Sequence, residues 1–295
     1  MRSVNNHCDL YDFSIWGNED VSSGKGAKDE NFPVGSLLIS RKLRPHVQAY
    51  YNFARVIDDI ADSEMLSSEE KVKRLNGMQA VLCDDVPAPD RADVQAARYL
   101  RNSLLETGVS FDTATDLLIA FRQDAVKNRY ETFAELLEYC RYSANPVGHY
   151  LLDLHKENAD TKPAADALCT SLQILNHLQD CRSDLIRLDR CYIPLDMLRA
   201  ENVDVQAVKD EGTISGLRNV FDYILDYIDD LNREAEQLIR LTSNRRLRME
   251  SSVILTLACS LTEHLRKEDP LATRVKLNYK DAIKAVLYAC PHILR

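Results

Sequence analysis

Two acidic clusters in this chain share one spacing. Asp58 and Asp62 are four residues apart, and Asp180 and Asp184 repeat that spacing, with Asn176 four residues before them. On a helix, residues four apart lie one above the other on the same face. Leu, Ile, Val and Phe surround both clusters, which indicates helices that face a core rather than freely solvated ones.

Stacked like charges repel each other, and the repulsion grows when they are partly buried. A sequence with two such pairs on apolar helices is suited to holding a cation. Carboxylate and amide oxygens without a Cys or His set favour Mg²⁺ over Ca²⁺ or Zn²⁺, and Mg²⁺ commonly bridges to phosphates. We therefore predict a Mg²⁺–diphosphate site whose metal ligands are Asp58, Asp62, Asn176, Asp180 and Asp184. The alternative is two solvated faces with Arg55, Arg182 and Arg187 as ion-pair partners.

The elements that position these clusters are predicted to be helices. The chain has only 9 Gly and 9 Pro, and apolar residues recur at helical rather than alternating spacing. We predict an all-α fold of about 9–12 helices. The longer predicted helical runs cover 43–62, 68–82, 92–107, 111–127, 131–155, 161–186, 212–241, 246–267 and 279–289.

The sequence offers few candidate domain boundaries. Residues 1–32 are polar and glycine-rich and are predicted to be irregular, whereas 33–295 contain no long linker and are predicted to form one all-α domain. The N-terminal residues lack the apolar centre of a signal peptide, and no apolar run reaches about 18 residues. The eight Cys are scattered without a CxxC pair, which is typical of reduced thiols in a cytoplasmic protein.

The charge balance limits the partners. The chain has 46 acidic and 37 basic residues, a net charge of −9, which argues against nucleic-acid binding because phosphate neutralisation needs clustered Lys and Arg. We interpret a third acidic patch at Asp226, Asp229 and Asp230 as a solvated face.

Three blocks of the sequence resemble signatures of the squalene/phytoene synthase family. The first is Tyr51-xxx-Arg55-xx-Asp58-Asp59-xx-Asp62, the middle block is 139–148, and the last is Gln173-xx-Asn176-xxx-Asp180-xxx-Asp184 followed by 190–194. Their order and spacing match the family, and the likeness covers roughly 29–290. The resemblance implies an isoprenoid synthase fold around a central apolar cavity, which joins two prenyl diphosphates head to head with Mg²⁺.

Within the family, segments 29–36 and 176–181 are most similar to the bacterial hopanoid-pathway branch that acts on presqualene diphosphate. For that branch we expect ionisation of the diphosphate, rearrangement of the cation and capture by water, which gives hydroxysqualene. The sequence departs from the family at Asn145-Pro146, where Gly is usual, and at Gln179, where a basic residue is common.

The resemblance also assigns roles. Arg55 is expected to bind the diphosphate as a bidentate donor, with Arg274 as a weaker candidate. Tyr51 and Tyr139 are expected to face the cation or to position water, with core packing as the alternative. Asn145 is a candidate for positioning water. The catalytic candidates are Tyr51, Arg55, Tyr139 and Asn145, and the substrate-binding candidates are Arg55, Gln173, Asn176 and Arg274.

Other functions remain open at this point. A presqualene diphosphate synthase or a phytoene synthase would use the same motifs, and a non-catalytic assembly or binding factor would not need both intact. No GxGxxG motif supports a reductive step with NADPH. The expected partners are presqualene diphosphate, a transiently contacted membrane surface and neighbouring hopanoid-pathway enzymes. The expected location is the cytoplasm, including the inner surface of the membrane.

Overall fold

The computed structural model describes residues 13–17, 21, 38–84, 86–87 and 89–293. These described residues form α-helices and short 3-10 helices but no β-strand, so the all-α prediction is confirmed. A single isolated bridge pairs Arg129 with Cys191. None of the helices described is long and apolar enough to cross a membrane.

The chain divides into two compact units. The first comprises 1–26 and 41–126. Its helices are α1 (Arg44–Asp62), α2 (Ser68–Asp84), α3 (Ala92–Thr107), α4 (Asp112–Asp124) and the 3-10 helix η2 (Phe13–Trp16). Helix α1 packs on α2, α3 and α4 through Val47, Tyr50, Phe53, Ile57 and Ile60. This apolar face fixes the rotation of α1 and thereby the direction of its acidic residues.

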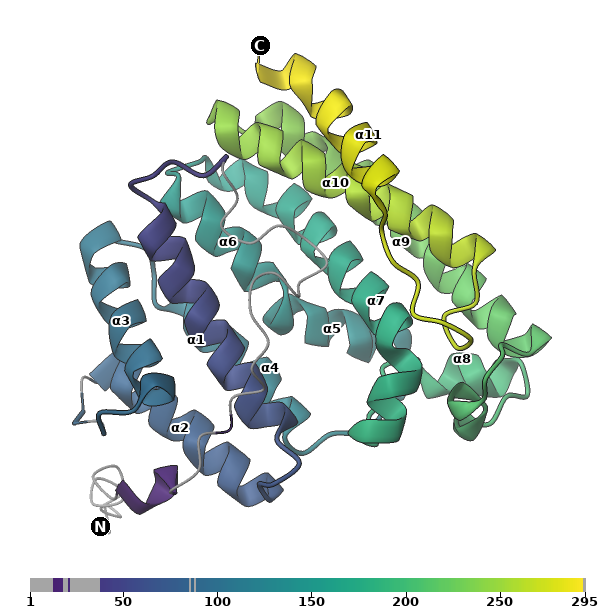
Figure 1. Cartoon of the computed structure of the whole chain (residues 1–295), viewed down its shortest axis with the longest axis horizontal. Helices are drawn as coiled ribbons and strands as arrows, with labels where there is room; N and C mark the ends of the chain where they lie inside the picture. Colours follow the sequence, from purple (N-terminus) through teal and green to yellow (C-terminus); the bar gives the residue numbers. More distant parts are fainter. Residues whose placement is uncertain (1–12, 18–20, 22–37, 85, 88, 294–295) are drawn as a thin grey trace. The chain divides into compact units, whose positions relative to one another are not determined.

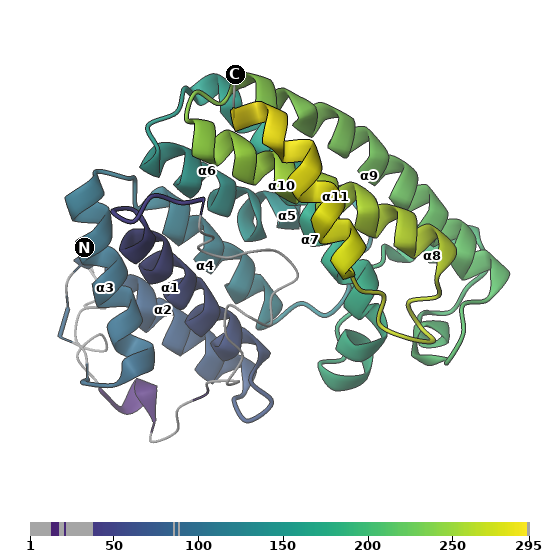
Figure 2. The same cartoon turned by 45° about the horizontal axis from the view of Figure 1, so that its top comes forward.

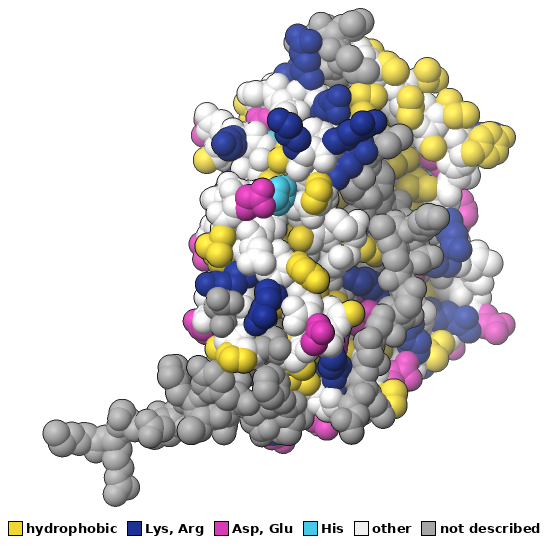
Figure 3. Space-filling view, turned by 60° about the vertical axis from the view of Figure 1, so that its left-hand side comes forward, with side chains coloured by type: hydrophobic (Ala, Val, Ile, Leu, Met, Phe, Trp, Pro, Cys, Tyr) yellow, Lys and Arg dark blue, Asp and Glu magenta, His cyan; other side chains and the backbone are white. Residues whose placement is uncertain are grey.

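The second unit comprises 27–40 and 127–295. Helix α7 (Lys162–Arg187) packs against α5 (Phe133–Ser143), α6 (Asn145–Leu154), α9 (Ser215–Leu241) and α10 (Arg245–Lys267) (Figure 1). The remaining helices are α8 (Leu195–Ala200), α11 (Tyr279–Ala289) and the 3-10 helices η3 (Ala159–Thr161), η4 (Val205–Lys209) and η5 (Cys290–Ile293). Helix α11 lies along α10 (Figure 2). Hydrophobic side chains gather on part of the surface (Figure 3, upper right).

One helical prediction needs correction, and one helix was missed. The run 131–155 is not one helix, because the backbone turns at Ala144 (φ −123°, ψ −45°) between α5 and α6. Pro146 follows at the start of α6, where the missing N–H costs nothing but a continuous helix would be broken. Helix α8 was not predicted at all.

Two further predictions about organisation remain predictions. The irregular segment 1–32 lies outside the described residues, apart from 13–17 and 21. The assignment of 33–295 to one domain is likewise not tested by the two units.

The chain after α7 returns to the segment before α5. The amide of Cys191 donates to the carbonyl of Asn128 (2.9 Å), and the amide of Leu195 donates to the carbonyl of Tyr130 (2.9 Å). These bonds run on either side of Tyr192 and bring it beside Tyr130, 62 positions earlier in the sequence.

Candidate functional site

The first acidic cluster lies on α1 around Arg55. Its guanidinium contacts Asp58 (2.9 Å) and Asp59 (2.7 Å). Asp59 is 6% exposed, whereas the side chain of Asp58 is 30% exposed. Asp59 therefore anchors the guanidinium from inside the unit and leaves Asp58 as the more accessible carboxylate. Tyr51 is half-buried one turn earlier on the same helix.

Arg55 offsets only part of the unfavourable charge around Asp58. Burial raises the pKa of Asp58 above its usual value, the carboxylate of Asp62 raises it further, and Arg55 opposes both. Asp59 and Asp124 add to the increase in the pKa of Asp58. Asp124 is a buried residue at the end of α4, and sequence reasoning missed it because a single acid carries no spacing signal. The four carboxylates favour a cation at this end of α1.

The second motif lies on α7 in the second unit. Gln173, Asn176, Asp180 and Asp184 are all half-buried, as expected for residues that share one helix face. Arg274, which lies in the segment between α10 and α11, makes two hydrogen bonds with Asp180, from Nε to Oδ1 (2.6 Å) and from Nη2 to Oδ2 (2.8 Å). The structure thus brings one predicted substrate-binding residue directly to a predicted metal ligand.

Gln179 holds the segment between α10 and α11 in place. Its side-chain amide donates to the carbonyl of Val275 (2.6 Å), and Gln179 is only 3% exposed. The position that departs from the family pattern is therefore a buried attachment point for the residue next to Arg274.

An aromatic cluster lies beside the second motif. The rings of His177 and Tyr192 stack with centroids 3.6 Å apart, and Tyr139 lies 5.3 Å from Tyr192 and 5.8 Å from His177. The amide Nε2 of Gln173 donates to Nε2 of His177 (3.2 Å). Tyr130 stacks on the Tyr192 ring at 5.3 Å. The predicted catalytic residue Tyr139 is therefore linked to the predicted substrate-binding residue Gln173 through His177.

The imidazole of His177 is neutral in this environment. Burial lowers the pKa of His177 to about 3, and the positive charge of Arg190 contributes. Arg190 is itself buried and donates to the hydroxyl of Tyr192 (3.3 Å), which lies 3.4 Å from the hydroxyl of Tyr139. Sequence reasoning assigned no role to Tyr130, Arg190 or Tyr192. The only available signal was the place of 190–194 directly after the second motif.

Asn145 lies at the start of α6 and is 8% exposed. Its side-chain oxygen accepts a hydrogen bond from the hydroxyl of Thr170 on α7 (3.1 Å). Asn145 thus links α6 to α7, and its predicted role in positioning water is not tested by this contact.

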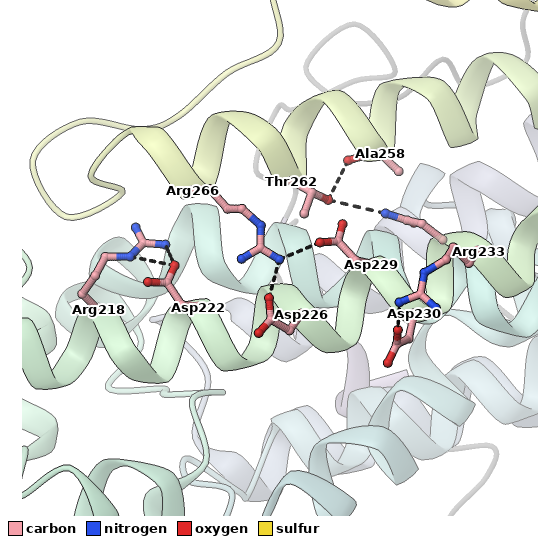
Figure 4. A network of polar contacts seen from close by, with 10 residues as sticks. Arg218, Asp222, Asp226, Asp229, Asp230, Arg233, Ala258, Thr262 and Arg266 are labelled. Atoms are coloured by element: carbon pink, nitrogen blue, oxygen red, sulfur yellow. Dashed lines mark hydrogen bonds and ion pairs between the residues drawn. The ribbon is translucent and has the colours of Figure 1, made fainter.

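The third acidic patch behaves as a solvated, ion-paired face. On α9, Asp226 and Asp229 contact Arg266 of α10 at 2.7 and 2.6 Å (Figure 4). The side chains of Asp226, Asp229 and Asp230 are 73%, 48% and 56% exposed. Asp230 pairs with Arg233 on its own helix. The two motifs also have arginine partners, and the patch differs from them because its carboxylates are far more exposed than those of Asp58 and Asp180.

The residues present suit Mg²⁺ by their chemistry. Among the residues described, no three His, Cys, Asp or Glu side chains gather closely enough to hold a metal ion. The two Asp pairs belong to different units, and each offers oxygen donors only. Hard oxygen donors in small number are what Mg²⁺ uses when it also bridges to a substrate phosphate. The union of the two pairs in one metal site stays a prediction.

Comparison with known proteins decides the family. The squalene/phytoene synthase family model matches residues 26–280. The chain belongs to the squalene/phytoene synthase family. It is an enzyme of squalene/phytoene synthase type, and the two motifs, the middle block and Arg274 all lie within the matched region.

Similar members of the family include hydroxysqualene synthases. The chain is 39% identical over 263 residues to the hydroxysqualene synthase of Zymomonas mobilis subsp. mobilis, covering 88% of this chain and 87% of the relative. It is 40% identical over 259 residues to that of Rhodopseudomonas palustris, with the same coverage. A phytoene synthase of Thermus thermophilus is 27% identical over 208 residues, covering 70% of each chain.

Solved structures agree on the fold. The squalene synthase HpnC from Alicyclobacillus acidocaldarius has a TM-score of 0.69 at 27% identity, over 79% of this chain and 87% of that one. A dehydrosqualene synthase solved with a ligand has a TM-score of 0.72 at 21% identity, over 88% of this chain and 90% of that one.

Proposed function

We propose that this enzyme converts presqualene diphosphate and water into hydroxysqualene and diphosphate, and that it requires Mg²⁺. The observation that carries the proposal is the 39–40% identity to hydroxysqualene synthases over 88% of the chain. The match to a phytoene synthase is lower and shorter, at 27% over 208 residues. The reaction balances because water supplies the hydroxyl group and the proton that is released accompanies diphosphate.

The residues of α1 hold the leaving group in this proposal. Arg55 donates to diphosphate oxygens, and Asp59 keeps its guanidinium in place through the 2.7 Å contact. Asp58 and Asp62 offer carboxylate oxygens to Mg²⁺, together with Asn176, Asp180 and Asp184 of α7. When bound, Mg²⁺ neutralises the negative charge that develops on the departing diphosphate.

The residues of α7 and the segment after α10 act on the same group. Arg274 binds diphosphate once Asp180 binds metal, because the carboxylate of Asp180 cannot serve both partners with the same oxygens. Gln179 holds the backbone of Val275 and thereby limits how far Arg274 can move. Gln173 is oriented toward its ligand by its hydrogen bond to neutral His177.

The aromatic side chains serve the carbocation. The ring faces of Tyr139, Tyr51 and the stacked pair of His177 and Tyr192 would stabilise positive charge by cation–π attraction. A neutral imidazole is required for this role, since a protonated one would repel a cation. Asn145 is proposed to position the water that captures the product cation.

The deciding experiment supplies two substrates to the purified enzyme with Mg²⁺. Presqualene diphosphate should yield hydroxysqualene, identified by gas chromatography and mass spectrometry, and farnesyl diphosphate alone should yield no product. In H₂¹⁸O, the hydroxyl oxygen of the product should carry the label. Chelation by EDTA should stop turnover, and added Mg²⁺ should restore it.

Each other outcome identifies a different function. Turnover of farnesyl diphosphate to presqualene diphosphate would assign the first half-reaction instead, and formation of phytoene from geranylgeranyl diphosphate would assign a phytoene synthase. Absence of turnover with every prenyl diphosphate would contradict a catalytic role and favour an assembly factor.

A further inference from the structure

Helix α11 carries a row of large apolar side chains on its surface. Tyr279, Ile283, Val286 and Leu287 are 71%, 55%, 49% and 67% exposed. Their spacing of four, three and one residues places them on one stripe of the helix. Single exposed apolar residues are ordinary, but a contiguous stripe marks a contact surface. We call these four residues the α11 face.

The opposite side of α11 is fixed to the unit. Ala285 and Ala289 are fully buried, and α11 packs on α10 (Figure 2). Asn278 caps the helix through a capping box with Asp281, whose carboxylate also contacts His264 on α10 (3.1 Å). The rotation of α11 is therefore set by packing, and the α11 face is its outward side.

The charges beside the α11 face are positive. Lys280 and Lys284 are exposed on the helix, and Lys276 is exposed just before it, whereas the neighbouring Arg274 is paired with Asp180. The acidic residue of this segment, Asp281, is 9% exposed and paired. Three basic residues against one buried acid in 275–289 contrast with the net charge of −9 for the chain. Figure 3 shows hydrophobic side chains gathered at the upper right, with Lys and Arg side chains nearby.

The residue types on and beside the α11 face indicate what kind of surface it binds. Lys is depleted at the cores of protein interfaces, whereas helices that lie in a membrane interface combine large apolar residues with Lys beside them. Tyr279 at the start of the helix suits the headgroup level, where amphipathic aromatic rings collect. Lysine stems can lie along the apolar layer while their ammonium groups reach anionic headgroups.

We propose that the α11 face docks the enzyme on an anionic lipid surface, with the helix lying in the plane of the membrane. The inference goes beyond the proposed function, and its test does not use the enzymatic reaction. Two acidic residues near α11 weaken the attraction: Glu263, whose carboxylate lies 3.8 Å from the ammonium group of Lys284, and Glu268, which contacts His264 (2.9 Å).

The test is flotation of the full-length protein with lipid vesicles. Vesicles of phosphatidylcholine with about one third phosphatidylglycerol should carry the wild type upward, whereas phosphatidylcholine alone should carry at least about tenfold less. The double variant I283S/L287S should lose at least about tenfold in partitioning to the anionic vesicles. The matched control, Y99S/L105S, changes two residues on α3 that are 63% and 60% exposed, and it should float like the wild type.

Three results would overturn the proposal. The first is wild-type protein that stays unbound with anionic vesicles, and the second is equal loss of binding in the α3 control. The third is a wild-type dimer, measured by light scattering, that I283S/L287S converts to a monomer, since a second copy would then cover the α11 face. Circular dichroism of both double variants verifies that each is folded before the comparison is made.

Discussion

Arg274 and Asp180 form a two-pronged ion pair between segments 94 residues apart, with contacts of 2.6 and 2.8 Å. Both residues were predicted to serve the diphosphate site, one as an anion binder and one as a metal ligand. The pairing means that the two functions compete in the ligand-free enzyme, because the guanidinium occupies both carboxylate oxygens.

Arg274→Ala tests this competition. Without the guanidinium, Asp180 is available to metal, and the Mg²⁺ concentration for half-maximal activity should fall by about threefold or more. Loss of the diphosphate contact should lower kcat/KM for presqualene diphosphate by about tenfold to a hundredfold. Steady-state kinetics over a Mg²⁺ series measures both effects.

Arg274→Lys is the matched control for the charge. It keeps the positive charge but lacks the planar fork, so it should recover part of kcat/KM without restoring the wild-type Mg²⁺ dependence. An unchanged Mg²⁺ requirement in both variants would show that Asp180 and Arg274 do not compete.

Asp58→Asn separates function from stability. Its carboxylate is disfavoured in the charged form by burial and by Asp62, so the neutral amide should leave the free energy of unfolding unchanged or raise it by up to about 1 kcal/mol. Turnover should fall at least about a hundredfold if the carboxylate binds Mg²⁺. Urea unfolding and product formation are measured on the same preparation.

The control for this substitution is Asp226→Asn on α9. Asp226 is 73% exposed and pairs with Arg266, so the change should affect neither turnover nor unfolding appreciably. Retained turnover in Asp58→Asn would remove Asp58 from the metal ligands.

The spacing of residues predicted many of the helices and part of the candidate site. Helices α1 and α3 end where the sequence predicts, and Gly108 ends α3 in a left-handed conformation (φ 72°). The acidic pairs were visible because both members lie on one helix. Residues that meet through tertiary contacts gave no such signal.

Two features illustrate what the sequence could not provide. The contact of Arg274 with Asp180 depends on where the segment after α10 returns to α7. Tyr192 reaches His177 only because the backbone bonds of Cys191 and Leu195 align two distant segments. The break at Ala144, by contrast, had a sequence signal that the predicted run 131–155 left out, because Pro146 cannot lie inside a continuous helix.

Thiol labelling tests the packing of the second unit. Burial raises the pKa of the Cys140 thiol and raises the pKa of Cys191 to about 11, so both remain protonated and unreactive at pH 8. Cys290 is exposed and should react with Ellman's reagent within minutes. A Cys8→Ser background removes the one cysteine outside the described residues.

Labelling at several pH values tests the same burial of the thiols. Between pH 7 and pH 9, Cys140 and Cys191 should stay unlabelled because the pH remains below their raised pKa values. Guanidinium chloride should expose every thiol. Native labelling of Cys140 at the rate of Cys290 would contradict the buried position of α5.

Asn145 and Thr170 allow a structural role to be distinguished from a catalytic one. Asn145→Ala and Thr170→Ala both remove the 3.1 Å hydrogen bond between α6 and α7, and each should lower the free energy of unfolding by about 1–2 kcal/mol. The double variant should lose less than the sum of the two. If Asn145 also positions water, only Asn145→Ala should change the ratio of hydroxysqualene to dehydrated by-products. Identical product ratios in both single variants would limit Asn145 to holding the helices together.

His177→Phe tests the link between the aromatic cluster and Gln173. The phenyl ring can keep the 3.6 Å stack on Tyr192 but cannot accept the hydrogen bond from Gln173, so thermal unfolding should change little. The freed amide of Gln173 loses its orientation, and we expect KM for presqualene diphosphate to rise by about tenfold with a smaller effect on kcat.

Tyr192→Phe is the complementary variant, because it keeps the stack and removes the hydroxyl contacts with Tyr139 and Arg190. It should leave KM near the wild-type value and lower kcat if these hydroxyls serve the cation. Equal changes in both parameters for both variants would indicate that the cluster acts only as part of the core.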